Sequence, residues 1–380
     1  MNIGIFTDSY LPYTSGVVRS IQIFKEELSR MGHEVFIFAP SYKNCGAESK
    51  VFRFASIPSP TNPDFTLAVP FSLRLKPTIQ RIKLDLIHVH SPFLLGRLGA
   101  RYARKLGIPL VFTFHTLYDQ YVHYVPFARS FTRELAQRIS REFCNQCDLV
   151  IVPTNIIEEY LRDIGVKSPI KRVPTGIKVD ELRSGNPEWL KNEYGISSAD
   201  KVLLFVGRLG QEKNIGFLLE SFCLINKEVE NTVLVLVGGG PEEEALKKKT
   251  KELGLSERVI FTGTLPYRDV INCYAGADMF LFSSVTETQG IVINEAKAAG
   301  LPVVAVKAYG VSEMVEDGVD GYLTVLETEQ FAERACRILK NDTMREEMSK
   351  KARKNAEKFS SAKCAAKLAD HYLKLINASC

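Results

Sequence analysis

Short apolar segments alternate with helical segments along the whole chain, and this alternation restricts the fold more than any other feature of the sequence. Short strands that are apolar throughout are typical of parallel sheets covered by helices on both faces. The pattern predicts strands at residues 2–6, 34–39, 85–90, 109–114, 148–152, 201–206, 232–237, 258–262, 278–282 and 302–306. It predicts helices near residues 17–31, 96–106, 127–146, 156–163, 215–228, 242–253, 267–275, 290–299 and 328–340. We therefore expect an α/β protein with two doubly wound, Rossmann-like domains.

The predicted strands fall into two sets, and a polar stretch near residues 171–200 separates them. A chain of 380 residues is long enough for two such domains. We expect an N-terminal domain over residues 1–175 and a C-terminal domain over residues 176–358. Residues 359–380 read as a C-terminal helix.

Composition excludes several classes of protein. With 45% hydrophobic and 24% charged residues the chain is an ordinary globular protein, and no apolar run is long enough to span a membrane. The N-terminus reads as a strand and not as a signal peptide, and the eight scattered cysteines fit reduced thiols, so we expect a cytoplasmic protein. Residues 1–175 hold 22 Lys and Arg against 14 Asp and Glu, a balance of +8, whereas the remainder is at −3. This basic half indicates either an anionic surface as partner or a solubilising charge excess, and no motif for nucleic acid accompanies it.

Two carboxylates stand at a predicted strand-to-helix junction in the second half. Glu287 and Glu295 follow the strand at 278–282 with seven residues between them. Ligands of open α/β sheets bind at such junctions, and a carboxylate can accept hydrogen bonds from two neighbouring hydroxyls of a sugar. Eight residues of continuous helix would rise about 12 Å. That separation would let one carboxylate bind a hexose and the other a ribose.

A cation pair follows another strand of the same half. Arg208 and Lys213 lie in the loop after residues 201–206, just before a predicted helix. Arg offers a planar fork of donors and Lys a movable charge, so the pair suits a diphosphate that gains charge during a reaction. The structural alternative is a solvated loop with a surface ion pair.

Two further junctions contain glycine. Residues 238–240 form a Gly-Gly-Gly turn that lacks both the dinucleotide and the P-loop spacing, and a structural turn is the favoured interpretation. Gly16 opens the first helix, where its amide could meet a phosphate or a sugar, and Ser15 before it is a plausible helix cap.

His115 ends the strand at 109–114, and a polar-aromatic loop with Tyr118, Asp119 and Tyr121 follows it. A side chain that leaves the carboxyl end of a strand faces the ligand side of the sheet, which favours a functional His115 over a structural one.

Two segments combine basic and apolar residues. Residues 71–84 interleave Leu and Ile with Arg74, Lys76, Arg81 and Lys83, and such a segment can lie on anionic lipid. Residues 127–143 have a similar composition, but there a helix packed on its own sheet is the favoured interpretation.

These motifs together resemble glycosyltransferase family 4, a family of retaining enzymes with the GT-B architecture. The resemblance covers essentially the whole chain. It rests on Glu287 with Glu295, on the Gly-Arg-Leu…Glu-Lys-Asn run at 207–214, on Phe-His-Thr at 114–116, on Gly-Gly-Gly-Pro at 238–241 and on the run at 298–304.

The resemblance implies a role for each motif. The family's two Rossmann-like domains face an inter-domain cleft, and its C-terminal helices cross back to the first domain. Glu287 would contact the donor hexose and Glu295 the ribose. Arg208 and Lys213 would hold the diphosphate, and His115 would lie beside the reacting carbon. The backbone amides of Thr288, Gln289 and Gly290 would approach the sugar and the phosphates.

This sequence departs from the family pattern at two places. It has Ser15-Gly16 where paired glycines are common, and Glu-Thr-Gln-Gly where Glu-Gly-Phe-Gly is common. The second form is similar to that of the bacterial diacylglycerol glucosyltransferases.

The resemblance implies a hexosyltransferase that moves glucose from UDP-glucose to a lipid hydroxyl, here of 1,2-diacylglycerol, with retention of the α configuration. Such an enzyme would lie peripherally at the inner face of the cell membrane. We expect Tyr118, Asp119 and Tyr121 on the acceptor side, no tightly bound metal, and Mg²⁺ at most as a stimulant. A GDP-mannose-dependent α-mannosyltransferase acting on phosphatidylinositol or a soluble acceptor is the main alternative. A non-catalytic sugar-nucleotide-binding protein is a further one, and the missing GxGxxG speaks against an NAD-dependent oxidoreductase.

Overall fold

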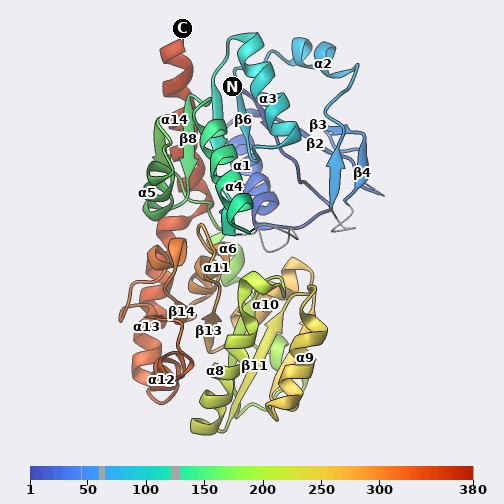
Figure 1. The fold of residues 1–380 in the computed structure, drawn as a ribbon. Coiled ribbons are helices and arrows are strands. Elements are labelled where there is room, and N and C mark those ends of the chain that lie inside the picture. Colours follow the sequence, from blue (N-terminus) through green and yellow to red (C-terminus); the bar gives the residue numbers. More distant parts are fainter. Residues whose placement is uncertain (44, 60–64, 121–128, 380) are drawn as a thin grey trace. The chain divides into compact units, whose positions relative to one another are not determined.

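The computed structural model describes residues 1–43, 45–59, 65–120 and 129–379, which form two compact units. Unit 1 comprises Met1–Gly176 together with Ser361–Cys380, and unit 2 comprises Ile177–Ser360. Each unit is built around one parallel sheet with helices on both faces (Figure 1). No helix in the described part of the chain is both long and apolar enough to cross a lipid bilayer.

The seven-stranded sheet of unit 1 has the order β3-β2-β1-β6-β7-β8-β9, and all its pairs are parallel. Its strands are β1 (Asn2–Phe6), β2 (Glu34–Pro40), β3 (Val51–Phe54), β6 (Leu86–Val89), β7 (Leu110–Thr113), β8 (Leu149–Val152) and β9 (Ile170–Arg172). A separate antiparallel pair is formed by β4 (Ser56–Pro58) and β5 (Thr66–Ala68). The helices are α1 (Gly16–Arg30), α2 (Leu75–Ile82), α3 (Leu94–Leu106), η1 (Tyr118–Gln120), α4 (Arg129–Cys144), α5 (Asn155–Asp163) and α14 (Ser361–Ser379).

The six-stranded sheet of unit 2 has the order β12-β11-β10-β13-β14-β15 and is also parallel throughout. Its strands are β10 (Lys201–Val206), β11 (Thr232–Val237), β12 (Val259–Gly263), β13 (Met279–Phe282), β14 (Val303–Val306) and β15 (Gly321–Thr324). Its longer helices are α8 (Ile215–Glu228), α9 (Glu243–Glu252), α10 (Tyr267–Gly276), α11 (Ile291–Ala299), α12 (Thr328–Leu339) and α13 (Asp342–Ala356). Shorter ones are α6 (Val179–Arg183), α7 (Trp189–Tyr194), η3 (Gln211–Lys213), η4 (Tyr309–Glu313) and η5 (Glu357–Phe359).

The prediction of two doubly wound α/β domains is confirmed, because the central strands are buried on both faces. Every residue of β6, β7, β8, β11 and β13 is buried, which matches their largely apolar sequences. The expectation of about five strands in each set was too low. The strands β3, β9 and β15, which the pattern did not predict, lie at sheet edges and are only three or four residues long.

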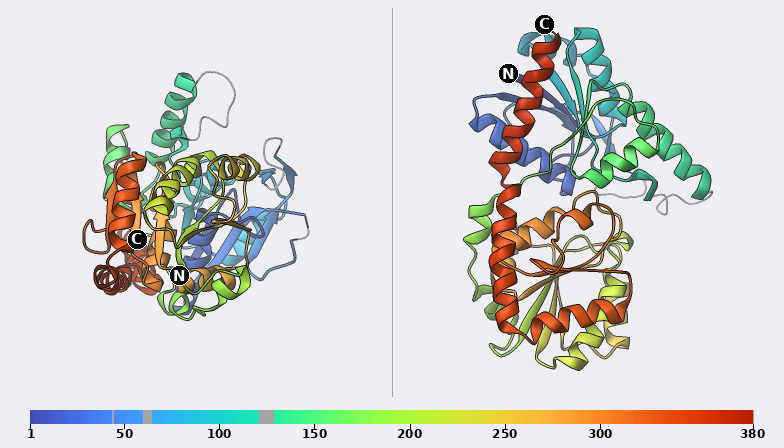
Figure 2. Two further views of the ribbon diagram at one scale, coloured as in Figure 1. Left: turned by 90° about the horizontal axis from the view of Figure 1, so that it is seen from below. Right: turned by 90° about the vertical axis from the view of Figure 1, so that its left-hand side faces the viewer.

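The C-terminal helix belongs to unit 1 although it follows unit 2 in the sequence. Helix α14 packs along α1 on one face of the sheet (Figure 2), and its Leu368 and Tyr372 are fully buried. The Ser361 hydroxyl donates to Glu27 Oε1 at 2.5 Å, and both residues are buried. A Cβ at Gly176 would lie 2.5 Å from the Ser361 Cα, so only glycine allows the two chain segments to come this close.

In each sheet the strand order reverses at one place, between β1 and β6 in unit 1 and between β10 and β13 in unit 2. The connections on either side of such a point lead away from each other and leave a crevice at the carboxyl ends of the strands. Gly16 follows β1, and Arg208, Lys213 and Glu287 follow β10 and β13, so these predicted site residues lie at the two reversal points, whereas His115 follows β7 and the basic residues of 71–84 lie in and around α2.

Candidate active site

At the reversal point of unit 2, the cation pair and one predicted carboxylate come from neighbouring strands. Arg208 and Lys213 follow β10, and Glu287 follows β13, which pairs directly with β10. Lys213 Nζ donates to Glu287 Oε1, and each side chain is 17% exposed. Arg208 is exposed on the same loop. The chain thus brings a lysine, an arginine and a carboxylate to one end of one sheet.

Hydroxyl groups at the end of β13 fix the two loops to each other. Ser283 Oγ donates to the Lys213 carbonyl at 2.7 Å, and Ser284 Oγ donates to the Glu212 carbonyl at 2.9 Å. Both serines are fully buried. Because the bonds reach the backbone of η3, they hold the segment that carries Lys213 without using its side chain.

The loop after Glu287 is held from the other side by η4. Gly310 N–H donates to the Glu287 carbonyl at 2.9 Å, and a Cβ at Gly310 would lie 1.9 Å from the Thr288 carbonyl oxygen. The loop ends at Gly290, whose φ of 76° suits glycine, and α11 begins with the next residue. Gln289 is buried and Thr288 partly exposed, so the predicted contacts of this loop with a ligand would come from its backbone.

Glu295 is more enclosed than its sequence position suggested. It lies in the second turn of α11, is 5% exposed, and accepts hydrogen bonds from Tyr267 Oη at 3.3 Å and Tyr274 Oη at 3.1 Å. Burial and the neighbouring Glu295 charge raise the pKa of Tyr274. Helix α11 covers only the second half of the interval from Glu287, so the rise of about 12 Å expected for a continuous helix does not apply. The assignment of Glu295 to a ribose stays a prediction.

The three glycines at 238–240 allow two loops to pack closely. Gly238 has a φ of 132°, and a Cβ there would lie 2.0 Å from the Gly207 carbonyl oxygen. Gly239 accepts the Leu209 amide through its carbonyl at 3.0 Å. The glycines therefore support the backbone beside Arg208, which agrees with the structural interpretation of this turn.

In unit 1, Ser15 is the N-cap of α1, since its Oγ accepts the Val18 amide at 3.3 Å. Gly16 begins the helix, and a Cβ placed on it would meet nothing within 4 Å. Its amide stands at the reversal point between β1 and β6, as a ligand contact would require, and that contact stays a prediction.

His115 follows β7 and is partly exposed. Its Nε2 lies 2.8 Å from His90 Nδ1, a hydrogen bond in which one ring donates and the other accepts. Burial lowers the pKa of His115 to about 3, so the imidazole is neutral at physiological pH. The neutral ring cannot act as an imidazolium acid at that pH, and it can still donate one hydrogen bond and accept another.

The predicted acceptor residues near His115 differ in their surroundings. Burial, with a smaller contribution from Asp8, raises the pKa of Tyr118, so its phenol stays protonated. Asp119 is buried and accepts from Gln137 Nε2 at 3.1 Å and Arg133 Nε at 3.4 Å, and so ties η1 to α4. Tyr121 lies outside the described residues.

The basic segment at 71–84 contains helix α2, and only some of its apolar side chains are exposed. Leu75 and Ile79 are buried inside unit 1, whereas Phe71 and Leu73 are 69% and 82% exposed. The four basic side chains of this segment, Arg74, Lys76, Arg81 and Lys83, are exposed. The apolar side chains that could enter a lipid surface therefore precede the helix and are not on it.

Comparison with known proteins identifies the family. Residues 14–181 match the model of Glycosyltransferase Family 4, and residues 188–355 match that of Glycosyl transferases group 1. The alpha-monoglucosyldiacylglycerol synthase of Acholeplasma laidlawii is 32% identical over 99% of this chain and 98% of its own length. The synthase of the same name from Streptococcus pneumoniae is 34% identical over 85% of this chain and 75% of its own.

This chain belongs to glycosyltransferase family 4. It is accordingly a hexosyltransferase. Solved structures have the same fold: sucrose-phosphate synthase from Thermosynechococcus elongatus has a TM-score of 0.83 at 19% identity and 99% coverage of both chains. HepE from Anabaena, solved with UDP-glucose, has a TM-score of 0.79 at 20% identity, with 99% of this chain and all of HepE covered. The predicted GT-B architecture is therefore confirmed as a fold.

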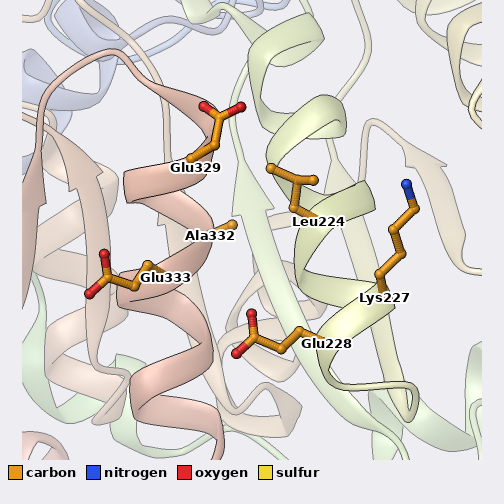
Figure 3. Close-up of a pocket in the computed structure, with 6 residues that line it drawn as sticks. All are labelled: Leu224, Lys227, Glu228, Glu329, Ala332 and Glu333. Atoms are coloured by element: carbon orange, nitrogen blue, oxygen red, sulfur yellow. The ribbon is translucent and has the colours of Figure 1, made fainter.

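A groove on unit 2 of this glycosyltransferase lies away from the candidate site. It encloses 420 Å³ between α8 and α12 and is lined by Leu224, Lys227, Glu228, Glu329, Ala332 and Glu333 (Figure 3). Because an α-helix rises about 1.5 Å per residue, Leu224 and Glu228 lie roughly 15–20 Å along α8 from the Lys213 end. The predicted donor residues do not line it.

Several residues that shape the glycosyltransferase site were absent from the sequence prediction. His90 could have been noticed in the His88-Val89-His90 pattern, where two histidines of a strand face the same side of the sheet. Ser283, Ser284 and Gly310 gave no signal, because their partners are backbone atoms of segments far away in the sequence.

Proposed function

We propose that this glycosyltransferase moves glucose from UDP-glucose to the hydroxyl group of 1,2-diacylglycerol and forms an α-glycoside with retention of configuration. The observation that carries the proposal is the 32% identity, over 99% of this chain, with an enzyme named alpha-monoglucosyldiacylglycerol synthase. UDP-glucose as donor is further supported by HepE, a protein of the same fold that was solved with it.

The chemistry proposed is a front-face displacement. The bond between the sugar C1 and the diphosphate oxygen breaks, and the acceptor oxygen bonds to C1 on the same face. The acceptor proton passes to the departing diphosphate, so no side chain forms a covalent intermediate. Arg208 and Lys213 would stabilise the charge that develops on the diphosphate, and the partly exposed Glu287 would bind hydroxyls of the hexose.

The supporting geometry is the neighbourhood of Lys213 and Glu287. Their ion pair supports the proposal, because a cation suited to phosphate lies next to a carboxylate suited to sugar hydroxyls, as two adjacent parts of one donor molecule would require. Removal of one preorganised charge contact of this kind costs on the order of 10²–10³ in kcat. Arg208→Met is therefore expected to lower kcat by that factor.

The test is a donor panel with UDP-glucose, UDP-galactose and GDP-mannose, with diacylglycerol in mixed micelles as acceptor. Released nucleoside diphosphate and the lipid product are both measured, and the product is digested with α- and β-glucosidase. Lys340→Met is the matched control, because this exposed lysine pairs with Glu228 in the groove away from the site. UDP release without lipid product, or a β-linked product, would overturn the proposal. Equal rates in the Arg208 variant and the control would remove the assigned role of Arg208.

A second candidate is a GDP-mannose-dependent α-mannosyltransferase acting on phosphatidylinositol or a soluble acceptor. It is favoured by a Corynebacterium glutamicum enzyme named GDP-mannose-dependent alpha-mannosyltransferase, which is 26% identical over 99% of this chain. Thermal stabilisation by GDP-mannose and not by UDP-glucose would favour this candidate over the first.

We also propose that the enzyme lies peripherally on the inner face of the cell membrane, through residues 71–84. Four exposed basic side chains at about 1 kcal/mol each would supply the attraction to anionic lipid, and Phe71 and Leu73 would enter the interface. Sedimentation with vesicles containing phosphatidylglycerol is expected to fall sharply when Arg74, Lys76, Arg81 and Lys83 are changed to Gln. The control changes four exposed lysines of unit 2 by the same charge, namely Lys248, Lys350, Lys351 and Lys354. An equal loss of sedimentation in both variants would show that total charge and not this segment determines vesicle binding, and it would refute residues 71–84 as the membrane-binding surface.

The reaction as proposed needs no tightly bound metal, since Arg208 and Lys213 can carry the diphosphate charge. Turnover is expected to survive EDTA and dialysis, with added Mg²⁺ giving at most a stimulation. Complete loss that only a divalent cation restores would contradict this.

A further inference from the structure

Three histidines and one tyrosine form a connected group in unit 1, in which His88, His90 and Tyr372 are buried and His115 is partly exposed. His88 lies in β6 and His90 just after it, so their side chains project to the same face of the sheet. The ring centroids of His88 and His90 are 4.2 Å apart, and those of His90 and His115 are 5.1 Å apart at an interplanar angle of 18°. The three imidazoles therefore follow one another from the inside of the sheet to its carboxyl end.

The register of the sheet produces these contacts. β6 and β7 are parallel, with His88 opposite Val111 and Val89 opposite Phe112. His88 Nε2 contacts Thr113 Oγ1 at 2.7 Å, and His90 Nδ1 contacts His115 Nε2 at 2.8 Å. If the register is continued beyond β6, His90 stands opposite Thr113. Each of the two histidines then contacts the residue two positions further along the neighbouring segment, so the same strand pairing sets both contacts.

The inner end of the group is fixed by the C-terminal helix. Tyr372 of α14 is fully buried, and its hydroxyl lies 2.5 Å from His88 Nδ1. The two rings meet edge to face at a centroid distance of 5.7 Å. Both nitrogens of His88 are therefore bonded, and its ring cannot turn without breaking a buried hydrogen bond.

All three imidazoles are uncharged at neutral pH. Burial lowers the pKa of His88 and of His115 to about 3, and it lowers the pKa of His90 well below its ordinary value. Between two neutral rings only one nitrogen can carry the shared proton, so the tautomers of His90 and His115 are coupled. His90 Nε2 is buried and finds no hydrogen-bond partner in the described part of the chain, so its Nδ1 contact is the one that orients the ring.

We propose that His90 is a positioning residue that fixes the orientation and the tautomer of His115, and that Tyr372 supports it through His88. This rests on the proposed function for the importance of His115 itself. His115 lies two residues beyond the end of β7, at the start of the loop that leads to Tyr118.

The test compares His90→Phe, His90→Asn and Tyr372→Phe. Phe keeps a planar ring at position 90 but removes the hydrogen bond to His115. Asn can place its amide nitrogen near the position of Nδ1 and so restore that bond. Tyr372→Phe keeps the packing of α14 and removes only the hydroxyl that contacts His88.

The first readout is ¹⁵N NMR of the imidazoles, which reports the tautomer of each histidine without any substrate. The chain has six histidines, so single substitutions suffice to assign the signals. We expect His115 to show one tautomer in the parent and in His90→Asn, and averaged shifts in His90→Phe. In Tyr372→Phe the shifts of His88 are expected to move. Unchanged His115 shifts in His90→Phe would overturn the proposal.

The second readout is kinetics with UDP-glucose and diacylglycerol. A misplacement of about 1 Å in a reacting group can cost about 10²-fold, so kcat of His90→Phe is expected to fall by roughly that factor with little change in the donor KM. His90→Asn should recover most of the loss. An unchanged kcat in a folded His90→Phe variant would also overturn the proposal, and so would equal losses in the Phe and Asn variants. Absence of turnover in the parent with any donor would instead refute the proposed function, while the NMR readout still decides the tautomer.

Discussion

The three connected histidines, His88, His90 and His115, make the stability of unit 1 depend on pH in a calculable way. In the folded chain His88 and His115 have pKa values of about 3, and the pKa of His90 is also far below its ordinary value. In the unfolded chain each imidazole has a pKa of about 6.5. Between these limits the unfolded state binds more protons than the folded state, so the free energy of unfolding falls as the pH falls. The contribution of the three histidines to the free energy of unfolding is fully present above pH 6.5 and is lost progressively as the pH falls from there towards 3.

The size of this loss of stability depends only on the pKa of histidine in the unfolded chain, provided that the pKa in the folded chain lies well below the working pH. Lowering the pH from 7.5 to 5.5 then costs about 1.4 kcal/mol for each histidine, or about 4 kcal/mol for the three. For a domain of this size 1 kcal/mol corresponds to about 2–4 °C in Tm, so unit 1 is expected to lose about 8–16 °C.

The assay is urea unfolding at pH 7.5 and at 5.5, followed by a probe in unit 1. His90→Asn is the matched variant, since it removes one titrating ring and keeps a hydrogen-bonding group. Its free energy of unfolding should change by about 1.4 kcal/mol less than that of the parent between the two pH values. The pKa of Asp8 is raised chiefly by burial, so Asp8 makes the free energy of unfolding rise as the pH falls. This contribution is present in both proteins and cancels when their pH dependences are compared. Equal pH dependence in parent and variant would refute the inference that His90 is neutral in the folded protein.

Two further predictions concern unit 2. Gly310→Ala should lower kcat by at least tenfold with little loss of global stability, because its Cβ would lie 1.9 Å from the Thr288 carbonyl oxygen and would push the loop that carries Glu287 out of place. Steady-state kinetics together with a Tm measurement checks this prediction, and unchanged kinetics would refute it. Asp320→Asn should lower the free energy of unfolding by about 3–5 kcal/mol, because it leaves the buried ammonium of Lys297 without the carboxylate that lies 2.6 Å away. Calorimetry checks this prediction. The double variant with Asp320→Asn and Lys297→Met should recover much of the loss.

The sequence was sufficient to predict the central strands of both sheets and to show which polar residues follow them, because both signals are local. A central parallel strand must be apolar on both faces, so β10 and β13 were visible as uninterrupted runs, and the residues that follow them were visible as polar. The edge strands β3 and β15 have no such requirement. Each has partly exposed positions and only four residues, which is too short for a pattern.

Side-chain contacts between segments that are distant in the sequence could not be predicted from the sequence alone. The pattern of residues 71–84 correctly indicated a basic amphipathic segment, but it could not show that Leu75 and Ile79 pack into unit 1 while Phe71 and Leu73 stay exposed. Likewise Glu295 was visible as an acid on a helix, and its two tyrosine partners on α10 depend on how the helices pack. The direction in which a side chain points is set by tertiary packing, which a single sequence does not display.

The two units use one topological rule in two chemically different ways. In unit 2 the reversal point carries charge: Lys213 and Glu287 come from the loops after β10 and β13 and pair with each other. A donor diphosphate that bound Lys213 would have to replace this carboxylate, and a hexose that bound Glu287 would have to replace this ammonium. A donor that carries both groups makes both replacements at once, whereas a nucleoside diphosphate leaves the carboxylate unpaired, at a cost of the order of 1–3 kcal/mol. With the roles proposed for Lys213 and Glu287, the pair would therefore favour the complete nucleotide-sugar over its product. In unit 1 the corresponding position carries neutral imidazoles held by their neighbours, so binding there would meet a preorganised surface without an ion pair to break.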